Sequence, residues 1–412
     1  MSGSVDRVFW DETTQTMPRE QLRKVQSERL QAAVQRAYEA GGFYRRRFDA
    51  AGIRPDDIAS VDDITTLPPF VKADLRANEA EHPPVGDYRP SGLKGAIRLA
   101  TSTGTSGRPT FMLWTKHDLE IDYELSARAR WRSGIRPGDI VVNAHPGYLN
   151  GGQAIMSGAM EYMGCLSVSI GPPEDDDAVI RALRTIEELP VAHWNLMPAA
   201  AARIRDIATR IGWTGELPPV ESITPARQWS AISAGLECIG TLGTTCNASE
   251  MRGAHIAEDF AIVEVVKPDT YEPVPDGERG SFVCTSLGRD NPTLRYDLQD
   301  VIRLDSSSCQ CGETHRRAFY DGRLQDVVDI QGKWILPIDV WVALPLGAEF
   351  VIVRRGETAD MLEVRIEGHP DTDLVDRLRT DLGVPVEVEW VADGTLPRAA
   401  YKAARVVDEP KQ

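Results

Sequence analysis

The pattern of apolar and polar residues at the start of the chain predicts helices. Apolar residues recur at steps of three and four through Pro18–Ala40, which predicts one long helix that stops at Gly41 and Gly42. A shorter helix is expected over Phe43–Ala51. The stretch Ser60–Ala80 has the pattern of a proline-containing loop that leads into another short helix.

The middle of the chain alternates between the periods of strands and helices. Runs rich in β-branched and aromatic residues predict strands at Thr110–Trp114, Asp139–Ala144, Phe260–Val266 and Gly280–Leu287. Helical periodicity covers His117–Ser133 and Asp177–Glu188. This mixture is typical of an α/β architecture.

From about residue 326 the elements become shorter. Strands are expected at Glu349–Arg355 and Met361–Gly368, followed by a helix over 371–383 and a strand over 384–390. This order indicates a separate α+β unit. We therefore predict a large N-terminal domain of mixed sheets and helices, residues 1–325, and a small mobile α+β domain, residues 326–412.

The charge balance limits the partners. The 412 residues carry a formal net charge of -16, whereas nucleic acids and anionic membranes bind basic surfaces. No apolar run approaches the roughly 20 residues that span a bilayer, and the N-terminus lacks the basic-then-apolar order of a signal peptide. We expect a cytoplasmic protein that binds neither nucleic acid nor membrane. Its six cysteines are expected as buried thiols or metal ligands rather than disulfides.

One loop raises the question of nucleotide chemistry. The stretch ATSTGTSGRPT (Ala100–Thr110) combines hydroxyl side chains with Gly104 and Gly107, and it lies between two expected strands. A Walker loop would carry Gly-Lys-Ser/Thr and open a helix, and this stretch does neither. Hydroxyls, glycines and backbone N–H groups suit an anion, but composition alone leaves a flexible surface turn as the alternative.

The order of several segments resembles the adenylate-forming (ANL) superfamily, and within it the phenylacetate–CoA ligase branch. The resemblance runs nearly end to end and is carried by LPPFVKADLRAN, TSTGTSGRPT, GYLNGG, PTLRYDLQD, DGRLQDVVDIQGKWILP and LPRAAYKAARVVD. It implies ATP-dependent activation of a carboxylic acid to an acyl-adenylate, with Mg²⁺ on the phosphates. Transfer of the acyl group to the thiol of coenzyme A or of a carrier protein would follow.

The resemblance also implies how ATP is bound. The loop would hold the β- and γ-phosphates, Asp300 would accept the ribose hydroxyls, and Arg323 would be a cationic partner. Lys402 would be the catalytic lysine that bridges the α-phosphate and the attacking carboxylate. The implied ATP-binding residues are Thr101, Ser102, Thr103, Gly104, Thr105, Ser106, Gly107, Arg108, Gly243, Thr244, Thr245, Asp300 and Arg323.

The chain departs from the family in the stretch TLGTTCNASE (Thr241–Glu250), where relatives have Tyr-Gly-x-Thr-Glu. Leu242 replaces the tyrosine that stacks on adenine, and Cys246 replaces the glutamate that holds Mg²⁺. Glu250 is the candidate replacement for that carboxylate.

Cysteines and a histidine suggest a metal site. Cys309 and Cys311 form a Cys-x-Cys pair, and Cys246 is followed by His255. A Cys₃His set is a common structural zinc site, and the order matches the zinc ligands of part of the resembled branch. We predict these four residues as zinc ligands, with His315 in reserve. Unrelated thiols are the alternative.

The residues of the substrate pocket are predicted mainly from the resemblance. It implies Tyr148, Gly151, Gly152 and Trp194 as pocket residues, although Trp194 is equally well explained as a core residue. The glycines leave room for a flat ring, so we expect an aromatic acid, aryl or arylacetic, of the hydroxybenzoate or hydroxyanthranilate type.

The sequence thus predicts an AMP-forming acid–thiol ligase. Two alternative functions remain: an adenylating enzyme with an amine acceptor, and a non-catalytic paralogue that binds an adenylate or acid. A homodimer is a further hypothesis.

Overall fold

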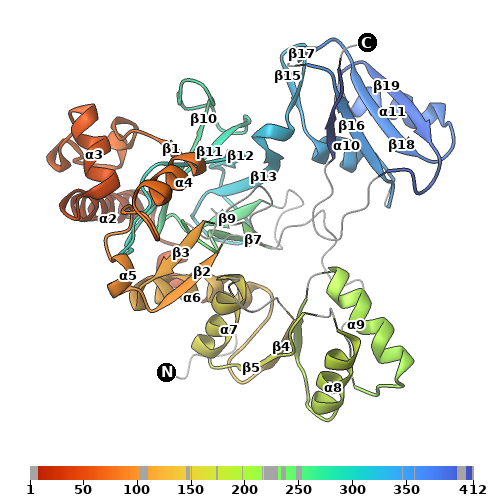
Figure 1. Ribbon diagram of the computed structural model, residues 1–412, viewed down its shortest axis with the longest axis horizontal. Helices are drawn as coiled ribbons and strands as arrows, with labels where there is room; N and C mark the ends of the chain where they lie inside the picture. The colour runs from red at the N-terminus through yellow and green to blue at the C-terminus, as the bar shows by residue number, and fades with distance from the viewer. Residues whose placement is uncertain are drawn as a thin grey trace. The chain divides into compact units, whose positions relative to one another are not determined.

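The computed structural model describes residues 8–101, 110–144, 149, 151–172, 175–196, 198–215, 217, 231–232, 238–246, 253–345, 347–356, 358–396 and 405–410. The chain divides into two compact units (Figure 1). The first comprises residues 1–298 and 303–319, and the second comprises 299–302 and 320–412. Helices and strands are mixed along the chain, so the predicted α/β class is confirmed.

The helices lie mainly in the first unit. Their bounds are α1 Glu12–Gln15, α2 Arg19–Glu39, α3 Gly42–Ala51, α4 Lys72–Glu81, α5 Gly92–Gly95, α6 Lys116–Arg132, α7 Gly151–Met163, α8 Asp176–Ile186, α9 Pro198–Arg210, α10 Pro337–Ala343 and α11 Thr372–Leu382. In the part of the chain that the structure describes, no helix is both long enough and apolar enough to cross a membrane.

The strands are distributed over both units. Their bounds are β1 Phe70–Val71, β2 Arg98–Thr101, β3 Phe111–Trp114, β4 Ile140–Asn143, β5 Leu166–Ser169, β6 His193–Asn195, β7 Ala231–Ile232, β8 Gly243–Thr245, β9 Ala254–Ile256, β10 Ala261–Val266, β11 Gly280–Ser286, β12 Tyr296–Asp305, β13 Arg317–Arg323, β14 Val328–Ile330, β15 Lys333–Ile335, β16 Phe350–Arg354, β17 Thr358–Ala359, β18 Leu362–Glu367, β19 Val386–Val391 and β20 Val406–Asp408.

Local signals explain the helix ends. The N-cap Thr115 of α6 accepts a hydrogen bond from the Asp118 backbone N–H, and the Asp118 carboxylate accepts one from the Thr115 backbone N–H, so the two residues form a capping box. Helix α2 ends just before Gly41, whose φ of 77° is unfavourable for other residues.

The largest sheet has the strand order β10-β11-β12-β13-β9-β8-β7, with β1 beside β12. Strand β9 is antiparallel to both of its neighbours. His255 on β9 therefore lies opposite Thr244 of β8 on one side and opposite Arg317 of β13 on the other. This register places one histidine between the strands that lead to the Cys246 and Cys309 segments.

A smaller parallel sheet has the order β5-β4-β6. Helices cover both of its faces, because Val141 of β4 packs with residues of α6 and α7, whereas Ala144 packs with residues of α8 and α9. Parallel strands covered on both sides are typical of α/β units.

The second unit is built on the sheet β19-β18-β16-β20 (Figure 1). Strand β18 alternates buried and half-buried residues, and its buried residues form a core with α10 and α11. Strand β20 pairs in parallel with β16, so the last described residues are part of the sheet. Residues 299–302 and 320–325 belong to this unit, although the sequence boundary at 325 does not include them.

Candidate functional site

Four metal-ligating side chains meet in the first unit. Cys246 follows β8, His255 lies on β9, and Cys309 and Cys311 lie in the turn between β12 and β13. One ligand atom from each lies within 4.8 Å of those of the others. The Sγ atoms of Cys246 and Cys309 are 3.5 Å apart, and Cys311 Sγ is 3.3 Å from His255 Nε2. The structure thus brings together the four predicted zinc ligands.

The spacing of this cluster suits zinc. Tetrahedral coordination with Zn–S bonds of about 2.3 Å places ligand sulfurs about 3.8 Å apart, close to the sulfur–sulfur separation observed here. Burial raises the pKa of Cys311 to about 12. Because zinc binds the thiolate form, we expect metal binding to release protons.

The orientation of His255 is fixed by a backbone carbonyl. Its Nδ1 lies 2.7 Å from the carbonyl oxygen of His315 and donates to it, which leaves Nε2 free to face Cys311. Burial lowers the pKa of His255, and the neutral ring is the form that binds metal.

Gly243 allows strands β8 and β9 to approach closely beside the cluster. A Cβ atom on Gly243 would lie 2.3 Å from the carbonyl oxygen of His255, and backbone atoms of a paired strand cannot move away cheaply. Gly243 was predicted from the resemblance as an ATP-binding residue. Its place in the sheet supplies a packing reason for glycine at this position, and its ATP role stays a prediction.

The loop after Cys311 is tied to the N-terminal segment. The Thr314 backbone N–H donates to the Gln15 carbonyl at 3.0 Å, and its hydroxyl donates to the Met17 carbonyl at 2.6 Å. His315 directs its ring nitrogens to the carbonyl oxygens of Ile256 and Thr14, both at 3.1 Å. Since both nitrogens face carbonyls, His315 is not the reserve metal ligand that the sequence suggested.

A buried ion pair lies against the cluster. Arg132 pairs with Glu313, and its guanidinium also lies 3.8 Å from Cys311 Sγ. Three thiolates around one divalent cation leave a net negative charge, so a neighbouring guanidinium would stabilise the cluster with zinc bound.

The strands on either side of residues 102–109 are held by buried polar contacts. The carboxylate of Glu79 accepts the backbone N–H of Phe111 at 3.2 Å, and the guanidinium of Arg89 donates to the Phe111 carbonyl. Before the loop, Thr101 N–H donates to the Leu149 carbonyl at 2.8 Å. These contacts fix the residues next to the predicted phosphate loop.

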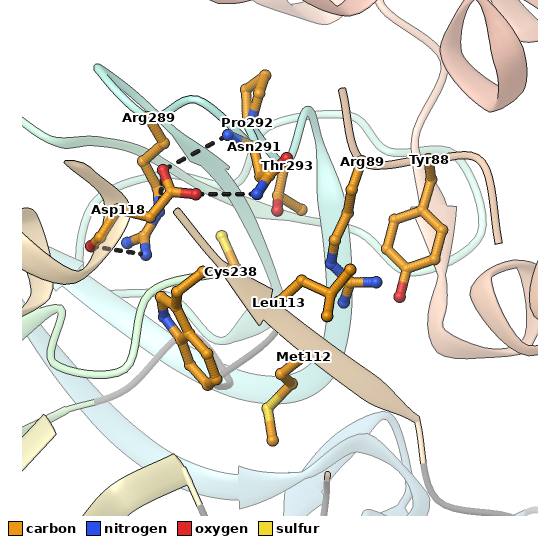
Figure 2. A pocket seen from close by; sticks show the side chains of 11 residues that line it. Tyr88, Arg89, Met112, Leu113, Asp118, Cys238, Arg289, Asn291, Pro292 and Thr293 are labelled. Carbon is orange, nitrogen blue, oxygen red and sulfur yellow. Dashed lines mark hydrogen bonds and ion pairs between the residues drawn. The ribbon is translucent and has the colours of Figure 1, made fainter. Parts of the chain in front are cut away.

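Arg89 also lines a small cavity (Figure 2). Figure 2 shows Arg89 and Tyr88 on one side of this cavity and Asp118, Arg289 and Asn291 on the other. The Asn291 amide donates to the Asp118 carboxylate at 2.9 Å. The cavity therefore lies between the segment that supports β3 and the N-terminus of α6.

In the second unit, Asp300 and Arg323 lie near each other on neighbouring strands. Arg323 Nε is 3.9 Å from Asp300 Oδ1, and the Tyr320 hydroxyl donates to the same oxygen at 3.3 Å. Burial raises the pKa of Tyr320, so its hydroxyl keeps its proton at neutral pH. Tyr320 was not among the residues predicted from the sequence. The feature that could have indicated it is its position three residues before Arg323 on β13.

The other predicted site residues are placed as follows. Gly151 and Gly152 begin α7, and Thr244 and Thr245 lie on β8. Trp194 packs edge-on against Trp213 with ring centroids 6.0 Å apart, which favours the core interpretation of this residue. Outside the described residues lie Ser102, Thr103, Gly104, Thr105, Ser106, Gly107, Arg108, Tyr148, Glu250 and Lys402.

Comparison with known proteins supports an adenylating enzyme. Residues 346–410 match the family of the AMP-binding enzyme C-terminal domain. The structure resembles a 2-hydroxyisobutyryl-CoA ligase in the postadenylation state, bound to 2-HIB-AMP, with a TM-score of 0.82 and 27% identity over 99% of this chain and 94% of that one.

The relatives found by sequence similarity indicate the family within this class of enzymes. A phenylacetate-coenzyme A ligase of Thermus thermophilus is 32% identical over 383 residues, which cover 86% of this chain and 83% of the relative. One of Pseudomonas putida is 29% identical and covers 99% of both chains.

Fold and sequence together define an AMP-forming acid–thiol ligase of the adenylate-forming superfamily. Within that superfamily, the chain belongs to the phenylacetate–CoA ligase family.

Proposed function

We propose that the chain activates an aromatic carboxylic acid with ATP and transfers the acyl group to the thiol of coenzyme A. The observation that carries this proposal is the likeness to the Thermus thermophilus ligase over most of both chains. The carboxylate attacks the α-phosphorus, pyrophosphate leaves, and an acyl-adenylate forms. The thiol then attacks the acyl carbon, and AMP leaves.

The chemical obstacle in the first step is the approach of two anions, so the site needs cations and hydrogen-bond donors. We assign Lys402 to the α-phosphate and the loop from Thr101 to Arg108 to the β- and γ-phosphates. Asp300 accepts the ribose hydroxyls and is oriented by the Tyr320 hydroxyl, at 3.3 Å. The acid is already ionised at neutral pH, and no general base is needed to activate it.

Two metals have separate roles in this proposal. Zinc held by Cys246, His255, Cys309 and Cys311 would link β8, β9 and the turn before β13 as a structural ion. The Cys246 thiol is therefore engaged and does not replace the glutamate that relatives use for Mg²⁺. We assign Mg²⁺ to the ATP phosphates, with Glu250 as the candidate carboxylate.

ATP–pyrophosphate exchange with a panel of acids tests the proposal. The panel contains phenylacetate, benzoates, hydroxybenzoates, hydroxyanthranilate and 2-hydroxyisobutyrate, the last because the structural neighbour binds the adenylate abbreviated 2-HIB-AMP. We expect exchange with an aromatic acid and thioester formation when coenzyme A is added. Exchange with 2-hydroxyisobutyrate alone would contradict the aromatic assignment. Transfer only to a carrier protein or an amine would contradict the acceptor, and exchange with no acid would favour a binding protein.

Lys402→Ala is expected to lower the exchange rate by at least about 100-fold, because a fixed cation at the α-phosphate acts in the transition state. The melting temperature should stay within about 2 °C of wild type. The check is exchange at saturating ATP and acid, beside a thermal unfolding curve. Undiminished exchange would overturn the assignment of this lysine.

Tyr320→Phe removes one hydroxyl and keeps the ring. We expect the KM for ATP to rise about 10-fold, because a hydrogen bond to a charged group contributes about 1.5 kcal/mol. Steady-state exchange at varied ATP measures this effect. Tyr271→Phe is the matched control, since its hydroxyl donates to Asp297 at 3.0 Å instead. Equal KM values for the two variants would contradict the role of Tyr320.

A further inference from the structure

The segment that carries Lys402 is bounded by two fixed points in the second unit. The last described residue before it is Leu396, and the first after it is Arg405. Leu396 is 6% exposed, and its backbone N–H donates to the Glu367 carboxylate at 2.7 Å. The N-terminal end of the segment is thus held by an acidic side chain of β18.

The other end is held by a second acidic side chain. Arg405 donates to the Glu349 carboxylate at 2.7 Å and to the Phe350 carbonyl at 2.8 Å, and its guanidinium lies over the Phe350 ring. Its own carbonyl accepts the Ile352 N–H at 2.7 Å. Three kinds of contact therefore fix Arg405 beside the start of β16.

The two carboxylates are themselves neighbours in the sheet. The backbone N–H of Glu367 donates to the Glu349 carbonyl at 3.0 Å, one step beyond the paired residues Phe350 and Ile366. Leu396 and Arg405, the described residues on either side of 397–404, are consequently tied to one place, at the start of β16 and the end of β18. Fixing the ends of a short segment lowers its conformational entropy before the reaction.

Beyond Arg405, ion pairs hold the chain in the sheet. Arg354 binds Asp408 through two contacts of 2.6 and 3.0 Å. Arg355 and Arg365 both bind Glu409, at 3.0 and 2.5 Å. With β20 fixed in this way, Arg405 is a rigid end point for the segment rather than part of a loose C-terminus.

We propose that Glu349 and Glu367 are positioning residues for adenylation, which hold Leu396 and Arg405 on either side of the segment that carries Lys402. The inference rests on the proposed role of Lys402. A catalytic group must be held close to its productive geometry, and small displacements cost up to about 100-fold in rate. Glu349 and Glu367 supply that restraint without contacting the substrate.

The test uses the full chain with Glu349→Gln, Glu367→Ala and the double variant. Glu349→Gln removes the ionic attraction to Arg405 and keeps a similar shape, and Glu367→Ala removes the acceptor for Leu396 N–H. We expect kcat for ATP–pyrophosphate exchange to fall about 5- to 10-fold in each single variant and at least about 30-fold in the double variant. The KM values for ATP and acid should be unchanged, because these residues do not contact either substrate.

Glu389→Gln is the matched control. Its carboxylate lies on the same sheet and pairs with Arg365 at 2.5 Å, but it contacts neither Leu396 nor Arg405. It should retain wild-type kcat. A double variant with kcat within twofold of wild type, beside an inactive Lys402→Ala, would overturn the positioning role alone, as would a KM increase with unchanged kcat. Equal exchange by wild type and Lys402→Ala would overturn the assignment of this lysine and this inference with it, whereas exchange with no acid would refute the proposed function itself.

Discussion

Cys311→Ser is expected to lower the zinc content from about one equivalent to less than about 0.2 and to destabilise the first unit by at least about 3 kcal/mol. Cys311 Sγ lies 3.3 Å from His255 Nε2 and within 4.8 Å of the other ligand atoms. Structural zinc sites contribute their binding free energy to folding, about 10–16 kcal/mol in small peptides. The first unit has a core of its own and depends less on the ion than these peptides do. We therefore expect a smaller loss of stability. Elemental analysis of protein purified without chelator and thermal unfolding measure the two effects.

Cys165→Ala is the control for this prediction. Cys165 is a buried free cysteine that packs with Trp131 and Met160 in a separate core cluster. It should leave the zinc content at about one equivalent. Full metal retention by Cys311→Ser would contradict the ligand assignment, and wild-type protein without metal would remove the zinc proposal.

Asp122→Ala is expected to lower the free energy of unfolding by about 3–5 kcal/mol. Asp122 is 1% exposed, accepts the Trp114 indole N–H at 2.7 Å and receives the Arg289 guanidinium at 2.7 and 3.1 Å. Burial alone would lower the pKa of Arg289, but the carboxylates around it raise that pKa above its usual value. Without Asp122, the buried Trp114 N–H loses its acceptor and the buried Arg289 loses its nearest carboxylate, which leaves it the carboxylate of Asp118 at 3.8 Å. Urea unfolding followed by tryptophan fluorescence measures the change.

Two further variants make this result interpretable. Glu120→Ala removes an exposed carboxylate of the same helix, 3.8 Å from Lys116, and should cost less than about 0.5 kcal/mol. Asp122→Leu combined with Arg289→Met should recover part of the loss, because replacing both partners of a buried pair by apolar residues is often close to neutral. An Asp122→Ala protein within about 1 kcal/mol of wild type would contradict the expectation.

The Cys₃His cluster could be predicted from the sequence because its residue types and their order along the chain are informative. The pair Cys246 and His255 lies far in sequence from the pair Cys309 and Cys311, with 63 positions between Cys246 and Cys309, and the pairing of β9 with β8 and β13 brings the two pairs together. What the sequence could not supply was the hydrogen-bond environment. The Nδ1 proton of His255 is assigned by a backbone carbonyl, and no residue pattern encodes that contact.

Other functional neighbours were missed for a related reason. Tyr320 lies twenty residues after Asp300, and Glu79 lies 32 residues before Phe111. Each contact depends on the orientation of one side chain in the folded protein. Periodicity predicts which face of a strand is buried, but it does not identify the polar partner that a buried group finds there.

The position of the domain boundary shows how far a change in the hydrophobic pattern indicates where one structural unit ends. The shorter elements begin near residue 326, and the sequence boundary was set there. Residues 299–302 lie within β12 and residues 320–323 form the end of β13, and both stretches belong to the second unit. A strand that spans two units has no break in its hydrophobic pattern, so composition could not reveal the division.

The attachment of the N-terminal segment to the loop after Cys311 has a consequence for biosynthesis. The Thr314 hydroxyl and the Met17 carbonyl that it contacts are 297 positions apart. Translation proceeds from the N-terminus at about 5–20 residues per second. Gln15 and Met17 therefore wait on the order of 15 seconds or more for Thr314, and they dock only when the Cys-x-Cys turn has been made. The segment that carries Gln15 and Met17 is in this respect made long before it can reach its native contacts.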